Sequence, residues 1–492
     1  MRNHHRKMEV VNNMESIWTQ NCTIEKHQPL LENEEVEIAV IGAGMAGILI
    51  AYHLKEAGKQ VIVLEANHIG SGQTQHTTAK ITSQHHLLYH HLLVNKGEEK
   101  ARQYAMANQK AIKEYERIIK KESIDCHFEY QPSFVFSDDF ITLEQEQKAA
   151  IRLGLPASIV EQVSLPVPVK YAIKFEQQAQ FHPLRFLKAL AKNLTIYENT
   201  FVQTVNDHMI VTTRGTITAQ KIVFACHYPF LNFPGMYFTK MHQERSYVLA
   251  LKNTTPLFGM YIGEWEEQIY SFRSYQDLLL FGGGGHRTGE NSLGGKYEAL
   301  RTKAKQLFPA SYEVAHWSAQ DCMPTDKVPF IGVYSNTKPH WYVATGFQKW
   351  GMTSSMVSAL LIRDAILGKE NPYAEVFSPQ RFSTETMSGI LCEGSQAVKG
   401  LSKRFFQIPE AKNLPIHHGG IITVNHEKVG VYKDENEKLF CVVPKCPHLG
   451  CQLEWNPDEL SWDCPCHGSR FDYEGNRLNG PAQKGVSHES YE

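Results

Sequence analysis

One glycine-rich segment restricts the fold of this chain more than any other feature. Residues 36–41 form an apolar run, and Gly42-Ala43-Gly44-Met45-Ala46-Gly47 follows it directly and opens a helix-like stretch. A second apolar run, residues 61–64, ends in Glu65. This order predicts a buried strand, a helix and a parallel strand, with the glycines at the turn where the helix begins.

The same segment favours a site for an adenine dinucleotide. Gly42 permits the tight turn, Gly44 lets a pyrophosphate approach the backbone, and Gly47 lets the helix pack on the strand. The start of the helix offers N–H groups and the positive end of its dipole to phosphates. Glu65 stands 21 residues after Gly44, where an acidic side chain binds ribose hydroxyls. The alternative is a glycine-rich turn that binds nothing, and the pattern by itself does not distinguish FAD from NAD.

Length and composition limit the partners of the chain. Its 492 residues suffice for about three domains. Fifty basic and 52 acidic side chains give a formal net charge of -2, which favours neither nucleic acid nor an anionic membrane. No apolar run reaches the roughly 20 residues of a spanning helix, and no apolar core follows the basic N-terminus. We therefore expect no membrane span, no signal peptide and a cytoplasmic location.

Five of the ten cysteines gather near the end of the chain, in and around two short loops that contain histidines. Each loop supplies one cysteine and one histidine, and this set fits a [2Fe–2S] centre with two thiolates on one iron and two imidazoles on the other. The four predicted ligands are Cys446, His448, Cys464 and His467. Zinc could use the same residue types. However, zinc gives no reason for a further cysteine in each loop, Cys451 and Cys466, and we favour iron and sulfide.

Sequence patterns also predict the domain organisation. Residues 1–35 are polar without a clear period and predict an N-terminal tail, whereas residues 36–372 carry strand and helix patterns of an α/β domain. Residues 373–404 show little periodicity and predict a linker. Residues 405–492 contain short β-like runs with Gly and Pro turns, which predict a small all-β domain that needs a metal or a cross-link for stability.

From residue 36 to residue 367 the chain resembles the glycine-oxidase and D-amino-acid-oxidase-like FAD oxidoreductases. The resemblance rests on the glycine turn and on residues 69–72, 200–202, 222–225, 329–332 and 344–347. It implies a Rossmann-like α/β FAD-binding domain with an interleaved α+β substrate domain. The FAD-binding residues that it implies are Gly42, Gly44, Gly47, Glu65, Ser71, Gly72, Val202, Gly346, Gly351 and Met352. The last three would place backbone N–H groups near the flavin.

The two Cys/His loops closely resemble those of Rieske iron–sulfur proteins, and the resemblance extends through Gly480-Pro481-Ala482. It implies a [2Fe–2S] cluster held by the four ligands named above. It also implies a disulfide between Cys451 and Cys466, which joins the two loops in respiratory-type Rieske domains.

Together the two resemblances imply an FAD-dependent oxidoreductase of the dehydrogenase type. Its substrate is expected to be a small amine or hydroxy compound, and its electrons to pass through the Rieske cluster to an external acceptor, a protein or a quinone-like molecule. Two alternatives are a redox-sensing flavin protein without turnover and a reductase fed by a protein donor. A nicotinamide-dependent reductase is disfavoured because no second dinucleotide motif is present.

The resemblance also suggests where catalysis occurs. Tyr247 and Arg273 lie in segments that line the substrate pocket of the resembled family, and Lys349 stands beside the turn that closes over the flavin. These three are the candidate catalytic residues. Four residues after Trp317, where glycine-oxidase-like enzymes carry an arginine for the substrate carboxylate, this chain has Asp321. We therefore predict that the substrate is not a simple α-amino acid.

Overall fold

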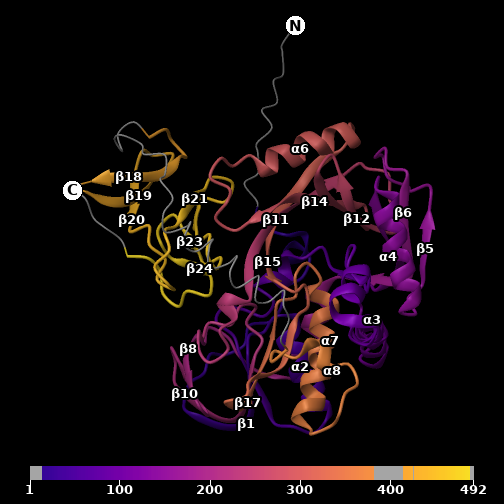
Figure 1. Ribbon diagram of the computed structural model, residues 1–492. Coiled ribbons are helices and arrows are strands. Elements are labelled where there is room, and N and C mark those ends of the chain that lie inside the picture. Colours follow the sequence, from indigo (N-terminus) through magenta and orange to yellow (C-terminus); the bar gives the residue numbers. More distant parts are fainter. Residues whose placement is uncertain (1–13, 382–413, 425, 488–492) are drawn as a thin grey trace.

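The computed structural model describes residues 14–381, 414–424 and 426–487. Figure 1 shows three parts: a sheet with β1, β10 and β17 below, a second sheet with β11, β12 and β14 above it, and a smaller β-rich part that contains β18–β24 at the C-terminal side. This arrangement is the predicted combination of an α/β domain, an interleaved second subdomain and a small all-β domain.

The first sheet has the strand order β16-β17-β10-β1-β2-β7, with β8 and β9 attached at β10. Its central strands β10, β1 and β2 are parallel, and α2 begins directly after β1, so the predicted strand, helix and strand are confirmed. The strands are β1 (Glu34–Ile41), β2 (Val61–Leu64), β7 (Thr195–Tyr197), β8 (Val202–Asn206), β9 (Met209–Thr212), β10 (Thr216–Phe224), β16 (Phe330–Ser335) and β17 (Lys338–Thr345).

The second sheet has the order β15-β11-β14-β13-β12-β4-β6-β3, with β5 paired to β6. Its strands come from both sides of β10 in the sequence, so the two subdomains are interleaved. They are β3 (Lys80–Ile81), β4 (Glu129–Ser137), β5 (Ala157–Val160), β6 (Tyr171–Gln180), β11 (Met241–Lys252), β12 (Met260–Trp265), β13 (Gln268–Tyr275), β14 (Leu278–Arg287) and β15 (Tyr312–Pro324).

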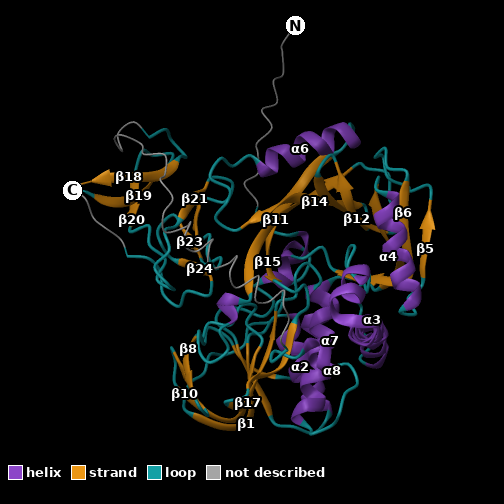
Figure 2. Cartoon of the chain, viewed as in Figure 1, coloured by secondary structure: helices purple, strands orange, loops and turns teal. Residues whose placement is uncertain are grey.

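Helices lie beside the first sheet, and α7 packs against both α2 and α3 (Figure 2). The α-helices are α1 (Ile17–Gln20), α2 (Met45–Glu56), α3 (Tyr89–Lys121), α4 (Phe140–Arg152), α5 (Pro183–Ala191), α6 (Lys296–Leu307), α7 (Gly351–Ile366) and α8 (Ala374–Phe377). Two short 3₁₀ turns are η1 (Gln73–His76) and η2 (Tyr237–Thr239). No described helix combines the length and the apolar character needed to cross a membrane.

The C-terminal domain is all β, as predicted, and consists of two antiparallel sheets. Its strands are β18 (Gly419–Val424), β19 (Glu427–Lys433), β20 (Leu439–Val442), β21 (Glu454–Asn456), β22 (Ser461–Asp463), β23 (Arg470–Asp472) and β24 (Arg477–Asn479). Trp455, Trp462 and Phe471 form its core together with the cysteines of the two loops. The loops that bear the cysteines therefore contribute to the hydrophobic core of this small domain.

The predicted N-terminal tail is wrong for residues 14–35, because this segment packs on the domain. Trp18 is fully buried. Its Nε1 donates a hydrogen bond to Thr77 O (2.7 Å), and its ring lies edge-on to His182 and Tyr275 at 5.0 and 4.8 Å. A single aromatic anchor in a polar segment produces no periodicity. Residues 1–13 lie outside the described residues.

The predicted linker begins later than expected. Residues 374–377 form α8, and Arg381 is paired with the buried carboxylate of Asp326 (Nε to Oδ2, 2.7 Å). The segment 373–381 therefore belongs to the first domain. Residues 382–404, the rest of the predicted linker, lie outside the described residues.

We expect Trp18→Ala to lower the free energy of unfolding by about 3–5 kcal/mol, because it removes a fully buried aromatic side chain. Urea denaturation of the full chain, followed in its first transition, measures this loss. Leu31→Ala is the matched control, since Leu31 is 80% exposed and its removal should change stability by less than about 0.5 kcal/mol. Equal effects of the two substitutions would show that the N-terminal segment is not anchored.

Candidate functional site

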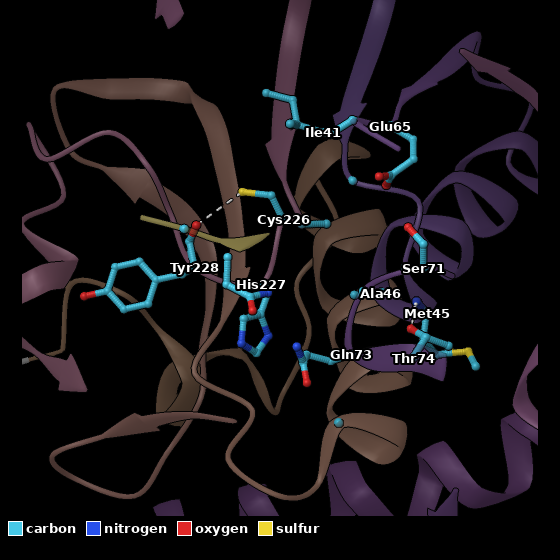
Figure 3. A pocket seen from close by; sticks show the side chains of 18 of the residues that line it. Ile41, Met45, Ala46, Glu65, Ser71, Gln73, Thr74, Cys226, His227 and Tyr228 are labelled. Carbon is cyan, nitrogen blue, oxygen red and sulfur yellow. Dashed lines mark hydrogen bonds between the residues drawn. The ribbon is translucent and has the colours of Figure 1, made fainter. Parts of the chain in front are cut away.

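A cavity lies where β1, β2 and β10 end and α2 begins (Figure 3). Parallel sheets bind ligands at this edge, beyond the carboxyl ends of their strands. Eight of the ten predicted FAD-binding residues line the cavity: Gly42, Gly44, Glu65, Ser71, Gly72, Val202, Gly351 and Met352. The fold therefore brings predicted residues from five separate segments of the chain together at one cavity.

The other two predicted residues, Gly47 and Gly346, do not line the cavity but shape the backbone around it. A Cβ on Gly47 would lie 1.8 Å from Gly42 O, so the helix can approach the turn only at a glycine. Gly346 has a φ of +74°, and a Cβ there would lie 2.6 Å from Pro324 Cγ. The backbone around the cavity therefore requires a glycine at both positions.

Gly42 is likewise required by the backbone conformation, whereas Gly44 leaves open space in the cavity. Gly42 has a φ of +107°, and a Cβ would lie 2.6 Å from Ala225 O, so the fold itself requires this glycine. Gly44 caps the N-terminus of α2 with a φ of -76°, which other residues adopt readily. The nearest atom to its Cβ position is Thr74 Oγ1 at 3.4 Å. The space in front of Gly44 thus fits the close approach of a pyrophosphate.

Glu65 is held at the end of β2 by backbone groups. Ala43 N donates to one carboxylate oxygen (2.8 Å) and Asn67 N to the other (2.9 Å). Burial raises the pKa of Glu65, and these hydrogen bonds act in the opposite direction. A carboxylate fixed in this way beside the glycine turn could accept hydrogen bonds from ribose hydroxyls.

Lys349 lines the cavity, but two carboxylates already neutralise its ammonium group. Asp321 Oδ2 lies 3.2 Å and Glu244 Oε2 lies 3.3 Å from Lys349 Nζ. Burial alone would lower the pKa of Lys349, but the two carboxylates outweigh it and raise the pKa. Because Asp321 also lines the cavity, this group of three side chains places one excess negative charge beside it.

The prediction that Arg273 is catalytic is wrong. Its side chain is 1% exposed and does not line the cavity. The guanidinium donates to backbone carbonyl oxygens of Ala79 (2.9 Å), Phe181 (3.1 Å) and Thr78. Burial lowers the pKa of Arg273 to about 9. Its role in the structure is to join β13 to two segments of the first domain.

The structure also places Tyr247 away from the cavity. The residue is fully buried, and its hydroxyl is hydrogen-bonded to His286 Nε2 (3.0 Å) and Asn291 Nδ2 (3.3 Å). These partners lie where the C-terminal domain meets the second sheet. The predicted catalytic role of Tyr247 therefore has no support from its position in the structure.

The two Cys/His loops come together in the C-terminal domain. The rings of His448 and His467 are 4.9 Å apart and nearly perpendicular. His448 Nε2 is hydrogen-bonded to Asn232 Oδ1 of the first domain (2.6 Å), whereas His448 Nδ1 is buried and has no hydrogen-bond partner among the described residues. The donor set and this buried nitrogen fit a cluster iron, which could be bound through Nδ1.

The cysteines of the loops divide into two pairs. Cys451 and Cys466 form a disulfide that joins the loops. Cys446 and Cys464 are buried and hydrogen-bonded to each other, and this contact with a further hydrogen bond from Ser469 favours a thiolate at Cys446 and lowers its pKa. A thiolate is the form that binds iron. The four predicted ligands are therefore located where they could hold a [2Fe–2S] cluster.

The second loop, residues 464–469, is buried and faces the first domain rather than solvent. Gln243 Nε2 donates to His467 O (2.6 Å), and Gln320 Nε2 donates to Gly468 O (2.7 Å). Arg287 Nε donates to Pro465 O (3.1 Å). Side chains from three neighbouring strands, β11, β15 and β14, thus bind the backbone of one loop.

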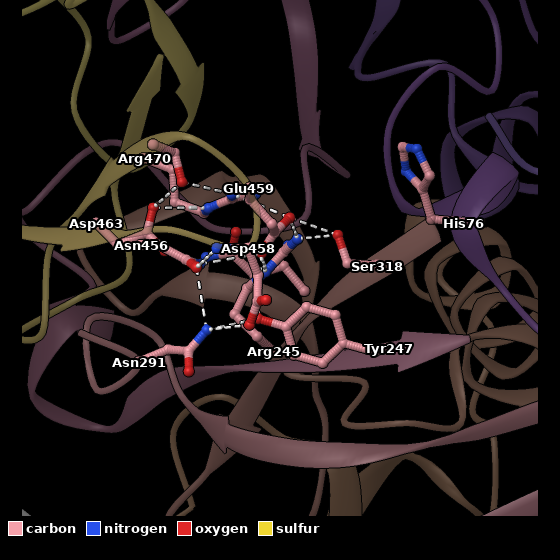
Figure 4. Close-up of polar contacts among 12 residues, drawn as sticks. His76, Arg245, Tyr247, Asn291, Ser318, Asn456, Asp458, Glu459, Asp463 and Arg470 are labelled. Carbon is pink, nitrogen blue, oxygen red and sulfur yellow. Dashed lines mark hydrogen bonds and ion pairs between the residues drawn. The ribbon is translucent and has the colours of Figure 1, made fainter. Parts of the chain in front are cut away.

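A buried ionic cluster fixes the same interface (Figure 4). Arg245 of β11 and Glu459 of the C-terminal domain pair through two contacts, one of them Nε to Oε2 at 3.0 Å, and their side chains are 3% and 6% exposed. Arg470 adds a contact to Glu459 (3.1 Å) and another to Asp463 (2.9 Å). The sequence does not indicate this cluster, because isolated charged residues in distant segments give no spacing signal.

The C-terminal domain also contributes to the cavity. Arg477, Leu478, Asn479, Gly480 and Gln483 line it together with the glycine turn. The two domains therefore share one wall of the cavity, which their separate sequence motifs do not predict.

Comparison with known proteins agrees with this arrangement. A family model described as FAD dependent oxidoreductase matches residues 37–365, and a model described as Rieske [2Fe-2S] domain matches residues 405–491. The putative Rieske 2Fe-2S iron-sulfur protein YhfW of Bacillus subtilis is 34% identical in an alignment of 490 positions that covers 96% of this chain and 96% of its own.

Solved structures resemble the first domain. Glycine oxidase from Geobacillus kaustophilus aligns with a TM-score of 0.57 at 19% identity, over 71% of this chain and 99% of its own. L-proline dehydrogenase from P. horikoshii aligns with a TM-score of 0.58 at 18% identity, over 71% of this chain and 98% of its own. At this level of identity the likeness supports the fold.

We expect Gly44→Val to reduce the flavin content of the purified protein about tenfold or more while the chain still folds, because the added side chain enters the space in front of α2. The ratio of flavin to protein absorbance measures this. Gly47→Ala is the contrasting variant: its Cβ would meet Gly42 O at 1.8 Å, so it should impair folding itself. Full flavin content in Gly44→Val would contradict the assignment.

We expect Glu459→Gln to destabilise the protein by about 3–5 kcal/mol, because it leaves two buried arginines with one carboxylate between them. Urea denaturation checks this against Glu474→Gln, which removes an exposed carboxylate of the same domain.

The same cluster predicts a pH dependence. Burial would raise the pKa of Glu459, but Arg245 and Arg470 hold it well below its usual range. The stabilisation is therefore present above the unfolded-state pKa of about 4.3 and is lost as the pH falls towards the folded-state value. Wild type should lose stability in acid more steeply than Glu459→Gln, and equal slopes would refute this role.

Proposed function

This chain belongs to the FAD dependent oxidoreductase family and carries a Rieske [2Fe-2S] domain, and from this premise we propose that it oxidises a small amine and delivers the electrons to an external acceptor. It is an enzyme with FAD and a [2Fe–2S] cluster as cofactors. When bound, FAD takes up two electrons from a substrate, and a Rieske cluster carries one electron at a time.

The shared cavity is the observation that carries the proposal. Its wall contains the glycine turn, the loop before α7 and the β24 region of the domain with the Cys/His loops. We assign FAD to the residues of this cavity that are named above, and the cluster to Cys446, His448, Cys464 and His467. An arrangement with both cofactor sites on one interface supports electron passage within the chain.

The charge beside the cavity supports an amine as substrate. Asp321 and Glu244 outnumber Lys349, and like charges repel by about 4 kcal/mol at 4 Å when the effective dielectric constant is about 20. A substrate carboxylate would meet this excess negative charge, whereas a protonated amine would be attracted to it. We therefore propose that these side chains bind and orient an amine that lacks an α-carboxylate.

Anaerobic mixing of the purified protein with a panel of amines, hydroxy compounds and amino acids tests this proposal. We expect amines to bleach the flavin absorbance within seconds and the electron paramagnetic resonance signal of a reduced Rieske centre to follow. A redox sensor without turnover would show no bleaching by any member of the panel. Rapid bleaching by glycine, sarcosine or a D-amino acid would contradict the substrate class.

We expect Asp321→Asn to reduce kcat/KM for the best amine about tenfold or more, because it removes the excess negative charge while Glu244 still pairs with Lys349. Steady-state kinetics with an artificial acceptor measures the change. Glu290→Gln, which removes an exposed carboxylate, is the control. An unchanged kcat/KM in Asp321→Asn would exclude Asp321 from substrate binding.

A further inference from the structure

Arg477 is a cation of the Rieske domain that lies in the wall of the first domain's cavity. It begins β24 (Arg477–Asn479) and lines the cavity together with Gly44 and Glu65. Its guanidinium carbon lies 4.4 Å from the centroid of the Phe201 ring. Phe201 directly precedes Val202, one of the residues assigned to FAD.

The charges around the cavity single out this arginine. Among the described lining residues, Lys349 and Arg477 are the permanent cations, and burial lowers the pKa of the lining His227 to about 4. Lys349 is paired with two carboxylates, whereas Arg477 forms no ion pair with a described residue. One full positive charge in the cavity is therefore available to a ligand.

The position of Arg477 indicates which end of a ligand it meets. Phe201, on which Arg477 stacks, directly follows Thr200, whose N–H donates a hydrogen bond to Glu65 O (2.8 Å). Burial lowers the pKa of Arg477, and Cys226 and Glu65 oppose this only in part. Glu65 is hydrogen-bonded to Ala43 N in the glycine turn (2.8 Å). Arg477 thus lies at the end of the cavity that contains the start of α2, and Lys349 belongs to the part beside Asp321.

We propose that Arg477 binds the ADP half of FAD and supplies the positive side-chain charge that faces its pyrophosphate. The start of α2 offers backbone N–H groups and a partial charge to the phosphates, but the nearest fixed side-chain charge of the glycine turn is the carboxylate of Glu65. A guanidinium stacked on Phe201 is oriented in advance, and its planar donors match phosphate oxygens.

This role makes the Rieske domain part of the FAD site. The ionic cluster around Glu459 docks the domain, and docking brings Arg477 into the cavity. By linkage, FAD in turn stabilises the docked position. The inference rests on the proposed placement of FAD in this cavity and not on the identity of the substrate.

FAD affinity of the full chain tests the role of Arg477. FAD released on dilution of the holoprotein is measured by its fluorescence for wild type, Arg477→Gln, Arg477→Lys and Lys484→Gln. We expect Arg477→Gln to raise the dissociation constant about tenfold or more and Arg477→Lys to recover part of the loss. Lys484→Gln removes an exposed cation of the same domain outside the cavity and should behave as wild type.

Salt provides a second measurement that a purely structural role would not affect. Raising the salt concentration should weaken FAD binding in wild type more than in Arg477→Gln, because salt screens an ionic contact and not a neutral one. Unchanged Rieske absorbance in each variant shows that the domain remains folded.

The outcomes separate this inference from the assignment of the cavity. If Gly44→Val loses FAD but Arg477→Gln retains wild-type affinity and salt dependence, the role of Arg477 is overturned and the cavity assignment stands. If Gly44→Val also retains FAD, the placement of FAD itself is wrong.

Discussion

The pairing of β11 with β15 is the constraint on which both sites depend. Side chains alternate between the two faces of a strand, so neighbours along the chain serve different purposes. Gln243 and Arg245 of β11 point to the C-terminal domain, and Gln320 of β15, paired with Arg245, does the same. Glu244 and its partner Asp321 have the opposite orientation, towards Lys349 and the cavity. One pair of strands therefore docks the Rieske domain and sets the charge of the site.

Docking by a buried ionic cluster has consequences for specificity. Taking Arg245, Glu459 and Arg470 out of water is costly, and an ion left without its partner is costlier still. If the C-terminal domain docked in another orientation, buried ions of the cluster would lose their partners. The cluster therefore disfavours other orientations even where its net contribution to stability is small. The hydrogen bonds from Gln243 and Gln320 then hold the 464–468 loop in register, and His448 reaches Asn232. The geometry of both cofactor sites follows from one docking position.

The parts that sequence could predict are those in which local spacing carries the chemistry. The glycine turn with Glu65 and the two Cys/His loops needed only residue types at fixed intervals, and the structure places these residues at two sites. Trp18, Arg245 and Arg477 could not be predicted, because each acts through a partner 59 or more positions away in the chain. For Arg273 the family resemblance suggested a contact with substrate. In the structure its guanidinium donates hydrogen bonds to three backbone carbonyl oxygens instead.

The charge beside the cavity shows why the net charge of a site cannot be predicted from sequence motifs alone. Glu244 and Asp321 stand directly opposite each other on paired strands, a position in which like charges destabilise a sheet. Lys349, which follows β17 of the other sheet, compensates both carboxylates. Two strands of one sheet and the loop after β17 of the other must come together before these two negative charges and one positive charge form a group. A single aspartate after Trp317 indicated the sign, but only the register of β11 on β15 explains why that aspartate is tolerated and why the lysine beside it does not reverse the charge.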